Sequence, residues 1–339
     1  MTIKHLVFSG GGPAGLVLYG AAKKLNDGCW DIRNIKSIYG TSVGAFISVI
    51  ISLNYDWDWT DDYFIKRPWE KILNIEPLTI INAYNTKGLI NDSFICEAML
   101  PLLEAKGLNK NTTFKELYDY NNIDIHMYAT NLNGDRMSNV DISHKSFPDL
   151  TIVKGLSMST AYPFIFCPVI ENGNCYIDGG VLNNFPIIDC YNNNKCDESE
   201  ILAFNSWSEN KNLISNLDTD STLFDYFIIL FKKIRREIET VEMDISNIVK
   251  CDVDTIRGFQ PWIDVIESSE SREKLINIGI EKANNYIENI TINKENITIN
   301  KENITISNEN ITINNENISN NLDISNNLDI SNNLDISNN

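Results

Sequence analysis

The chain has 339 residues and is short of positive charge, of histidine and of long hydrophobic runs. It holds 28 Lys and Arg against 46 Asp and Glu, which gives a formal net charge of −18. Such a charge repels phosphate backbones, so a nucleic-acid partner is not expected. The longest apolar run, residues 45–53, is far shorter than the roughly 20 residues that a transmembrane helix needs. The sequence therefore predicts no membrane-spanning segment.

Cysteine pairing and a secretory leader are missing as well. The seven cysteines are odd in number and include no CxxC pair, which argues against a disulfide framework and against a zinc site. The N-terminus, MTIKHLVFSGGG, passes from a short apolar run directly into glycines, without the basic start and the cleavage site of a signal peptide. We therefore expect an intracellular protein, either soluble or peripherally associated with a membrane.

The end of the chain is a low-complexity tail. Residues 290–339 repeat ITINKEN and related heptads and then ISNNLD. A coiled-coil seam needs two apolar positions per heptad, whereas here a single Ile is accompanied by Asn, Thr and Ser. This composition predicts disorder, and a β-solenoid is the alternative. We therefore place one folded domain at 1–289 and a repeat tail at 290–339.

Strand and helix patterns alternate along residues 1–289. Short apolar runs precede longer segments of helical periodicity, which is the order of a parallel sheet covered by helices. The pattern therefore predicts one α/β domain. Strands are expected at 5–9, 35–39, 123–131, 137–142, 175–178 and 201–206. Helices are expected at 16–25, 43–53, 92–106, 113–120, 150–159, 222–241 and 270–289.

Residues 40–44 read GTSVG and match the GxSxG motif of serine hydrolases. Gly40 and Gly44 allow a sharp turn between the predicted strand and helix, so that the Ser42 hydroxyl stands exposed at a helix N-terminus. The amide groups and the dipole of that helix end favour negative charge near the serine oxygen. Ser42 is therefore the candidate nucleophile, and the alternative is a chance match to a short motif.

A serine nucleophile needs a base, and the histidines are badly placed to supply it. Only three occur and none lies after residue 144, whereas α/β-hydrolases place the histidine last. The best carboxylate is Asp178, which ends a predicted strand and precedes Gly179 and Gly180. The carboxyl ends of parallel strands present side chains to a ligand crevice. Asp178 is therefore the candidate base, against the simpler alternative that Asp-Gly-Gly is a plain turn.

The glycine-rich segment GGGPAG, which ends at Gly15, has two interpretations. It matches the G-x-G-x-x-G fingerprint of dinucleotide-binding and flavin enzymes, but the elbow at Ser42 stands where the ribose-binding acidic residue would lie. Alternatively, the N–H groups of Gly10, Gly11 and Gly12 form an oxyanion hole, because no side chains keep a substrate away from them.

Together these motifs resemble the patatin-like phospholipase family. GGGPAG, GTSVG and DGG follow one another as in that family, and the last continues as DGGVLNNFP at 178–186. Residues 159–168, STAYPFIFCP, are similar to the family's S-x-A-x-P-x-x-F-x-P block, and residues 113–118, TFKELY, to its T-F-x-E-L-Y segment. The joint occurrence of these blocks is far more specific than any one of them. The likeness covers roughly residues 4–290 and leaves the tail without a counterpart.

The resemblance implies a three-layer α/β sandwich around a mainly parallel sheet, with a Ser-Asp dyad that hydrolyses lipid esters. It gives Ser42 the role of nucleophile, Asp178 that of base and the glycine loop that of oxyanion hole. These groups supply every role, so no metal and no cofactor is expected, and the substrate is a lipid or fatty-acyl ester. Many relatives carry Lys or Arg inside the glycine loop, whereas this chain has Pro13 and Ala14 there.

Aromatic residues crowd the segment that follows the predicted elbow helix. They are Trp57, Trp59, Tyr63, Phe64 and Trp69, interleaved with four aspartates. Aromatic rings at the rim of a site can contact a lipid interface, which would give the protein a peripheral membrane contact here. The simpler interpretation is a short helix that packs onto the core.

The leading hypothesis is a phospholipase A-type enzyme or a lipase. One alternative is a flavin- or dinucleotide-binding oxidoreductase, because of the glycine fingerprint, and purified protein of that kind would show flavin absorbance. The other alternative is a catalytically silent member that serves as a binding scaffold. Labelling by a fluorophosphonate probe distinguishes the hydrolase from both alternatives.

Removal of the repeat tail should leave the folded domain intact. The tail lacks the apolar density that offsets chain entropy, so cleavage after Asn289 is expected to change neither the melting temperature nor the hydrolysis of a soluble ester. Calorimetry of the full and shortened chains measures this. A drop of several degrees in the melting temperature would instead support the solenoid.

Overall fold

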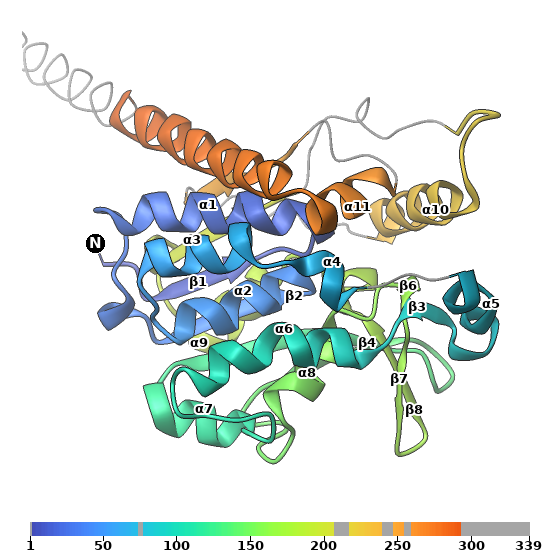
Figure 1. The fold of residues 1–339 in the computed structure, drawn as a ribbon. Coiled ribbons are helices and arrows are strands. Elements are labelled where there is room, and N and C mark those ends of the chain that lie inside the picture. The colour runs from blue at the N-terminus through green and yellow to red at the C-terminus, as the bar shows by residue number, and fades with distance from the viewer. Residues whose placement is uncertain (1, 74–76, 207–216, 239–246, 254–258, 293–339) are drawn as a thin grey trace, which may run out of the picture. The chain divides into compact units, whose positions relative to one another are not determined.

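The computed structural model describes residues 2–73, 77–206, 217–238, 247–253 and 259–292 (Figure 1). The chain divides between Asn284 and Asn285. Of the second unit only residues 285–292 are described, as the end of a helix that begins at residue 269. The predicted tail therefore lies almost entirely outside the described residues, and its disorder stays a prediction. None of the described helices is both long and apolar enough to cross a bilayer.

The first unit is built around an eight-stranded mixed sheet. Its strands are β1 (His5–Phe8), β2 (Ser37–Thr41), β4 (Asp124–Asn131), β5 (Ser138–Ile142), β7 (Val169–Glu171), β8 (Asn174–Asp178), β9 (Ile201–Asn205) and β10 (Ile248–Lys250). The hydrogen-bonded order is β10-β9-β1-β2-β4-β8-β7, with β5 also paired to β4. The first five of these run parallel, whereas β5, β7 and β8 run antiparallel to their partners. The predicted α/β class with a mainly parallel sheet is confirmed.

Helices flank the sheet (Figure 1). They are α1 (Gly15–Asn26), α2 (Val43–Ser52), α3 (Trp57–Lys66), α4 (Trp69–Ile72), α5 (Pro77–Thr86), α6 (Asp92–Glu104), α7 (Phe114–Asn121), α8 (Ile152–Ser159), α9 (Ile187–Asn194), α10 (Leu223–Ile238) and α11 (Gln260–Glu267). Val7 and Tyr39 pack with Cys190 of α9 in one apolar cluster. Strand side chains alternate between faces, so the neighbouring Leu6 and Ile38 point to the opposite face. Contacts of α1 and α2 with the strands complete the sandwich there.

Two strands meet end to end along one edge of β4. β5 pairs with residues of β4 that also pair with β2 and with β8, so β5 must occupy the opposite edge from both. β2 runs parallel to β4 and ends at Thr41 opposite Tyr128. β8 runs antiparallel and ends at Asp178 opposite Ala129. The carboxyl ends of β2 and β8 therefore meet at adjacent residues of β4.

A small second sheet holds two further helices against the domain. It consists of β3 (Gly88–Ile90) and β6 (Phe164–Phe166), which run parallel. Leu89, Ile90 and Ile165 of this sheet form a buried cluster with Ile228 of α10. Trp262 of α11 packs against the same cluster.

The aromatic segment after α2 is mostly buried. Tyr63, Phe64 and Trp69 are each less than a tenth exposed, and the Trp69 indole donates a hydrogen bond to the Phe64 carbonyl at 2.9 Å. Trp59 is 42% exposed but stacks on Tyr63. The interpretation that this segment packs onto the core is confirmed, and its burial leaves little aromatic surface there for a lipid interface.

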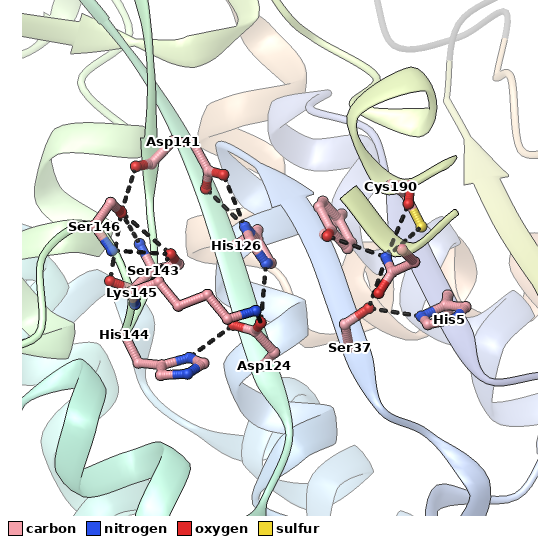
Figure 2. Close-up of polar contacts among 12 residues, drawn as sticks. His5, Ser37, Asp124, His126, Asp141, Ser143, His144, Lys145, Ser146 and Cys190 are labelled. Atoms are coloured by element: carbon pink, nitrogen blue, oxygen red, sulfur yellow. Dashed lines mark hydrogen bonds and ion pairs between the residues drawn. The ribbon is translucent and has the colours of Figure 1, made fainter. Parts of the chain in front are cut away.

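A charged network lies near the amino end of β4 (Figure 2). The two ring nitrogens of His126 face carboxylates, with Nδ1 2.8 Å from Asp141 Oδ1 and Nε2 3.3 Å from Asp124 Oδ2. Asp124 also contacts His144 Nδ1 at 2.8 Å and Lys145 Nζ at 2.6 Å. Burial lowers the pKa of His126, but the hydrogen bonds to the two carboxylates outweigh burial and raise it to about 9. His126 is therefore an imidazolium at neutral pH.

Replacement of His126 tests this network. The substitution His126→Asn removes the cation between two carboxylates and is expected to lower the free energy of unfolding by about 2 kcal/mol or more at pH 6.5. Because the folded pKa is about 9 and the ordinary value is 6.5, the stabilisation is complete below pH 6.5 and is lost as the pH rises through about 9. Urea unfolding at pH 6.5 and at pH 9.5 measures the effect. An equal difference between variant and wild type at both pH values would contradict the assignment.

Candidate active site

Ser42 lies at the turn between β2 and α2, as the GxSxG motif predicts. Its backbone φ is 57°, a left-handed conformation that is rare outside glycine. The helix passes very close to the sheet, since a Cβ on Gly44 would lie 2.5 Å from the Phe8 carbonyl oxygen and one on Gly40 would lie 2.5 Å from the Gly44 carbonyl. The motif glycines therefore allow the close contact that places the serine at the N-terminus of α2.

The elbow is tied to β4 where β2 and β8 meet. The Ser42 N–H donates to Ser159 Oγ at 3.0 Å, and the Ser159 hydroxyl donates to the Tyr128 carbonyl at 2.7 Å. Gly179 approaches the same carbonyl, because a Cβ on Gly179 would lie 2.1 Å from the Tyr128 oxygen. The Tyr128 carbonyl is therefore linked to the Ser42 turn through Ser159 and lies directly against the turn that follows Asp178.

Asp178 is buried, with 2% of its surface exposed. Its Oδ1 accepts a hydrogen bond from the Gly180 N–H at 2.7 Å, whereas its Oδ2 has no partner among the described residues. Burial raises the pKa of this carboxyl, and the Ser42 hydroxyl, the Gly180 N–H and the Arg235 guanidinium lower it. Burial prevails, and the pKa is about 6. The carboxylate can therefore exchange a proton near neutral pH.

The histidines lie toward the other end of the parallel strands. His5 begins β1 and its Nδ1 is 2.7 Å from Ser37 Oγ at the start of β2 (Figure 2). His126 pairs in register with Tyr39, three residues before the serine and so about 10 Å from it along the strand. His144 contacts Asp124 at the start of β4. The described geometry thus offers Ser42 no histidine base.

The glycine loop has fewer available donors than the sequence suggests. The Gly10 N–H donates to the Asn184 carbonyl at 3.0 Å, so Gly10 does not present a free oxyanion donor in this structure, contrary to expectation. The Asn184 carbonyl accepts this bond. A sequence pattern does not show which N–H groups of the glycine loop already have a hydrogen-bond partner. The N–H groups of Gly11 and Gly12 donate to none of the described residues. Gly15 begins α1.

Two residues of the site, Arg235 and Trp262, are absent from the motifs. Arg235 of α10 donates from Nη1 to Asn184 Oδ1 at 2.9 Å and lies beside the turn that follows Asp178, since a Cβ on Gly180 would be 3.6 Å from the same Nη1. Trp262 of α11 covers the glycine loop so closely that a Cβ on Gly12 would lie 2.4 Å from its ring. The sequence shows basic and aromatic residues in the C-terminal segments. Their spacing does not indicate that Arg235 contacts Asn184 or that Trp262 covers the glycine loop.

An apolar cavity of about 180 Å³ opens beside Ser42. Its lining includes Gly12, Phe46, Phe94, Phe166 and Trp262. This lining suits a hydrocarbon chain.

Arg272 is the one charged residue among the described residues that line the cavity. Its guanidinium donates hydrogen bonds to the backbone carbonyls of Ile65 at 2.7 Å, Val265 at 2.8 Å and Ile266 at 3.0 Å. Arg272 therefore joins the end of α3 to α11, which carries Trp262 over the glycine loop.

Metal-ligating side chains come together elsewhere in the described part of the chain. His5, Cys196 and Glu200 place ligand atoms within 4.8 Å of one another, but Lys4 already forms an ion pair with Glu200. This group lies near the amino end of β1, whereas Ser42 follows the carboxyl end of β2.

Several known proteins are similar to this chain. The model of the patatin-like phospholipase family matches residues 6–191. Uncharacterized protein R571 of Acanthamoeba polyphaga mimivirus is 27% identical over 292 residues, which are 84% of this chain and 94% of that protein. Probable lipid hydrolase 463L of Invertebrate iridescent virus 6 is 30% identical over 184 residues, which are 54% of this chain and 62% of that protein. Among solved structures, VipD from Legionella pneumophila aligns over 85% of this chain and 67% of its own, with 17% identity and a TM-score of 0.47.

The family match covers more than half of the chain. It includes the glycine loop, the elbow at Ser42 and the turn at Asp178. The chain therefore belongs to the patatin-like phospholipase family.

Proposed function

We propose that this protein is a lipid acyl hydrolase that cleaves ester bonds through an acyl-enzyme at Ser42, with Asp178 as the general base. The observation that carries the proposal is the end-to-end meeting of β2 and β8 on β4, which brings the serine elbow and the buried carboxylate together. The name of the viral relative 463L, a probable lipid hydrolase, supports the same substrate class.

Acylation uses groups already in place. The Ser42 oxygen attacks the ester carbonyl carbon, and the unpartnered Oδ2 of Asp178 takes the hydroxyl proton. Negative charge develops on the carbonyl oxygen, where the N–H groups of Gly11 and Gly12 and the N-terminus of α2 stabilise it. When the intermediate collapses, the carbon–oxygen bond to the alcohol breaks and Asp178 returns its proton to the leaving oxygen.

Deacylation repeats these steps with water. Asp178 takes a proton from the water as its oxygen attacks the acyl carbon, and Ser42 leaves with a proton from Asp178. The apolar cavity holds the acyl chain, and Trp262 keeps the glycine loop covered. Water exclusion strengthens the hydrogen bonds to the oxyanion.

A fluorophosphonate probe tests the nucleophile. Such probes phosphonylate activated serines, so wild-type protein should be labelled and Ser42→Ala should not. Ser48→Ala is the matched control, because Ser48 lies on the same helix and its hydroxyl bonds only to the Gly44 carbonyl among the described residues. Mass spectrometry of the labelled peptide locates the site. An unlabelled wild type would favour the silent scaffold, and bound flavin would favour the oxidoreductase.

The pH dependence tests the base. Asp178 acts only when it is ionised, so kcat/KM on a soluble ester should fall as the pH drops below about 6 and should level off above it. Arg235 lowers the pKa of Asp178, so Arg235→Met should move the midpoint of this limb to higher pH. Asp178→Asn should reduce the rate by about 10²–10⁴-fold. A rate that does not vary between pH 4.5 and pH 8 would exclude Asp178 as the base.

A further inference from the structure

Three side chains of the kinds that bind zinc come together near the amino ends of β1 and β9. They are the imidazole of His5, the thiol of Cys196 and the carboxylate of Glu200, whose ligand atoms all lie within 4.8 Å of one another. In a tetrahedral zinc site the ion lies about 2.0–2.3 Å from each ligand atom, which places those atoms about 3.5 Å apart. The three side chains therefore need to close by about 1 Å to hold an ion.

The sheet holds two of these ligands side by side. β1 and β9 run parallel, and His5 pairs in register with Ile201, the residue after Glu200. The Lys4 N–H donates to the Glu200 carbonyl at 2.8 Å, which extends the pairing by one residue. Cys196 lies shortly before Glu200, in the connection between α9 and β9. Strand register therefore sets the separation of His5 and Glu200, and a short connection supplies the third ligand.

The His5 ring is oriented as in many zinc sites. Its Nδ1 is 2.7 Å from Ser37 Oγ (Figure 2), and the residue is buried, at 3% exposure. Zinc-binding histidines use one ring nitrogen for such a hydrogen bond, which fixes the ring and directs the other nitrogen to the metal. Burial lowers the pKa of His5 to about 4, so the ring is neutral at neutral pH. Its Nε2 makes no hydrogen bond to a described residue and is therefore available as a ligand.

The ligand types indicate which ion fits. Nitrogen, sulfur and carboxylate oxygen together suit Zn²⁺, whereas Ca²⁺ and Mg²⁺ prefer sites built from oxygen alone. Cys196 forms no disulfide, and both Cys196 and Glu200 are half-buried, so that an ion can reach them from solvent. Three protein ligands and one water complete a tetrahedral shell.

Lys4 competes with an ion for Glu200. Its ammonium forms an ion pair with the Glu200 carboxylate, and its side chain is 33% exposed, so that it can turn into solvent. Lys36 is a second cation near the site, since both lysines lower the pKa of His5. Removal of the Lys4 charge should therefore strengthen metal binding, an effect that distinguishes a metal site from a purely structural ion pair.

We propose that His5, Cys196 and Glu200 form a zinc site that fastens the connection between α9 and β9 to the start of β1. Ser37 begins β2 beside His5, and Ser42 follows about 16 Å further along the chain. The ion is therefore structural, and the proposal does not depend on the proposed function. The cysteine spacing does not indicate this site, because only the pairing of β1 with β9 brings His5 to the other two ligands.

Zinc content tests the site. The reduced full-length chain, incubated with zinc chloride and then dialysed, should retain one zinc ion per chain by elemental mass spectrometry. In titrations against a chromophoric chelator, Cys196→Ser and His5→Asn should each weaken zinc binding at least about tenfold. The matched control is Cys96→Ser, which removes a half-buried thiol outside the site and should leave the affinity within about twofold. Lys4→Met should bind zinc more tightly than the wild type.

Cobalt and thermal unfolding identify the ligand and the effect. Co²⁺ bound to a thiolate gives a sulfur-to-metal charge-transfer band, which the wild type and Cys96→Ser should show and Cys196→Ser should lack. Zinc should raise the melting temperature of the wild type but not that of Cys196→Ser, because the ion binds the assembled site of the folded chain. His5 is buried, so if His5→Asn fails to fold, the Cys196 and Lys4 variants decide the test. A wild type that retains no zinc would overturn the proposal, as would undiminished zinc binding by Cys196→Ser or weaker binding by Lys4→Met.

Discussion

The register of strands on one edge of β4 is the constraint on which the site depends. β2 and β8 approach each other along that edge from opposite directions and end opposite Tyr128 and Ala129. A slip of one residue in β8 would turn Asp178 to the other face of the sheet, because strand side chains alternate. The Tyr128 carbonyl leaves no room for a side chain at position 179, which helps to hold this register.

The charged groups at the two ends of the parallel strands are paired to different degrees. Near the amino end, His126 lies between two carboxylates and its charge is balanced. At the carboxyl end, Asp178 receives one N–H and the influence of Arg235, and burial still favours its protonated form up to a pKa of about 6. A buried network whose charges are fully paired stabilises a fold. A buried carboxylate whose charge is only partly paired can keep a pKa at which it takes up and releases a proton. The charged network around His126 and the carboxylate proposed as the base therefore lie at opposite ends of the parallel strands.

The sequence predicts most of the central sheet and the strand-end positions of Ser42 and Asp178, because strand periodicity, GxSxG and a strand-ending Asp-Gly-Gly are local signals. It does not predict the contacts of Asn184 with Gly10 or of Arg235 with Asn184, which join residues 174 and 51 positions apart. The local sequence pattern also does not predict which side of α10 packs against the domain. Its apolar residues surround much of the helix, so only packing decides that Ile228 faces the domain and Leu230 faces outward.

The proposed nucleophile and base are 178 − 42 = 136 residues apart, and the antiparallel pairing of β8 with β4 joins them. Such pairings between distant segments form late, because a long loop must close first. A nascent or half-folded chain therefore carries the serine elbow without its carboxylate. Because Asp178 reaches the serine elbow only through this pairing, the proposed hydrolysis depends on completion of the sheet.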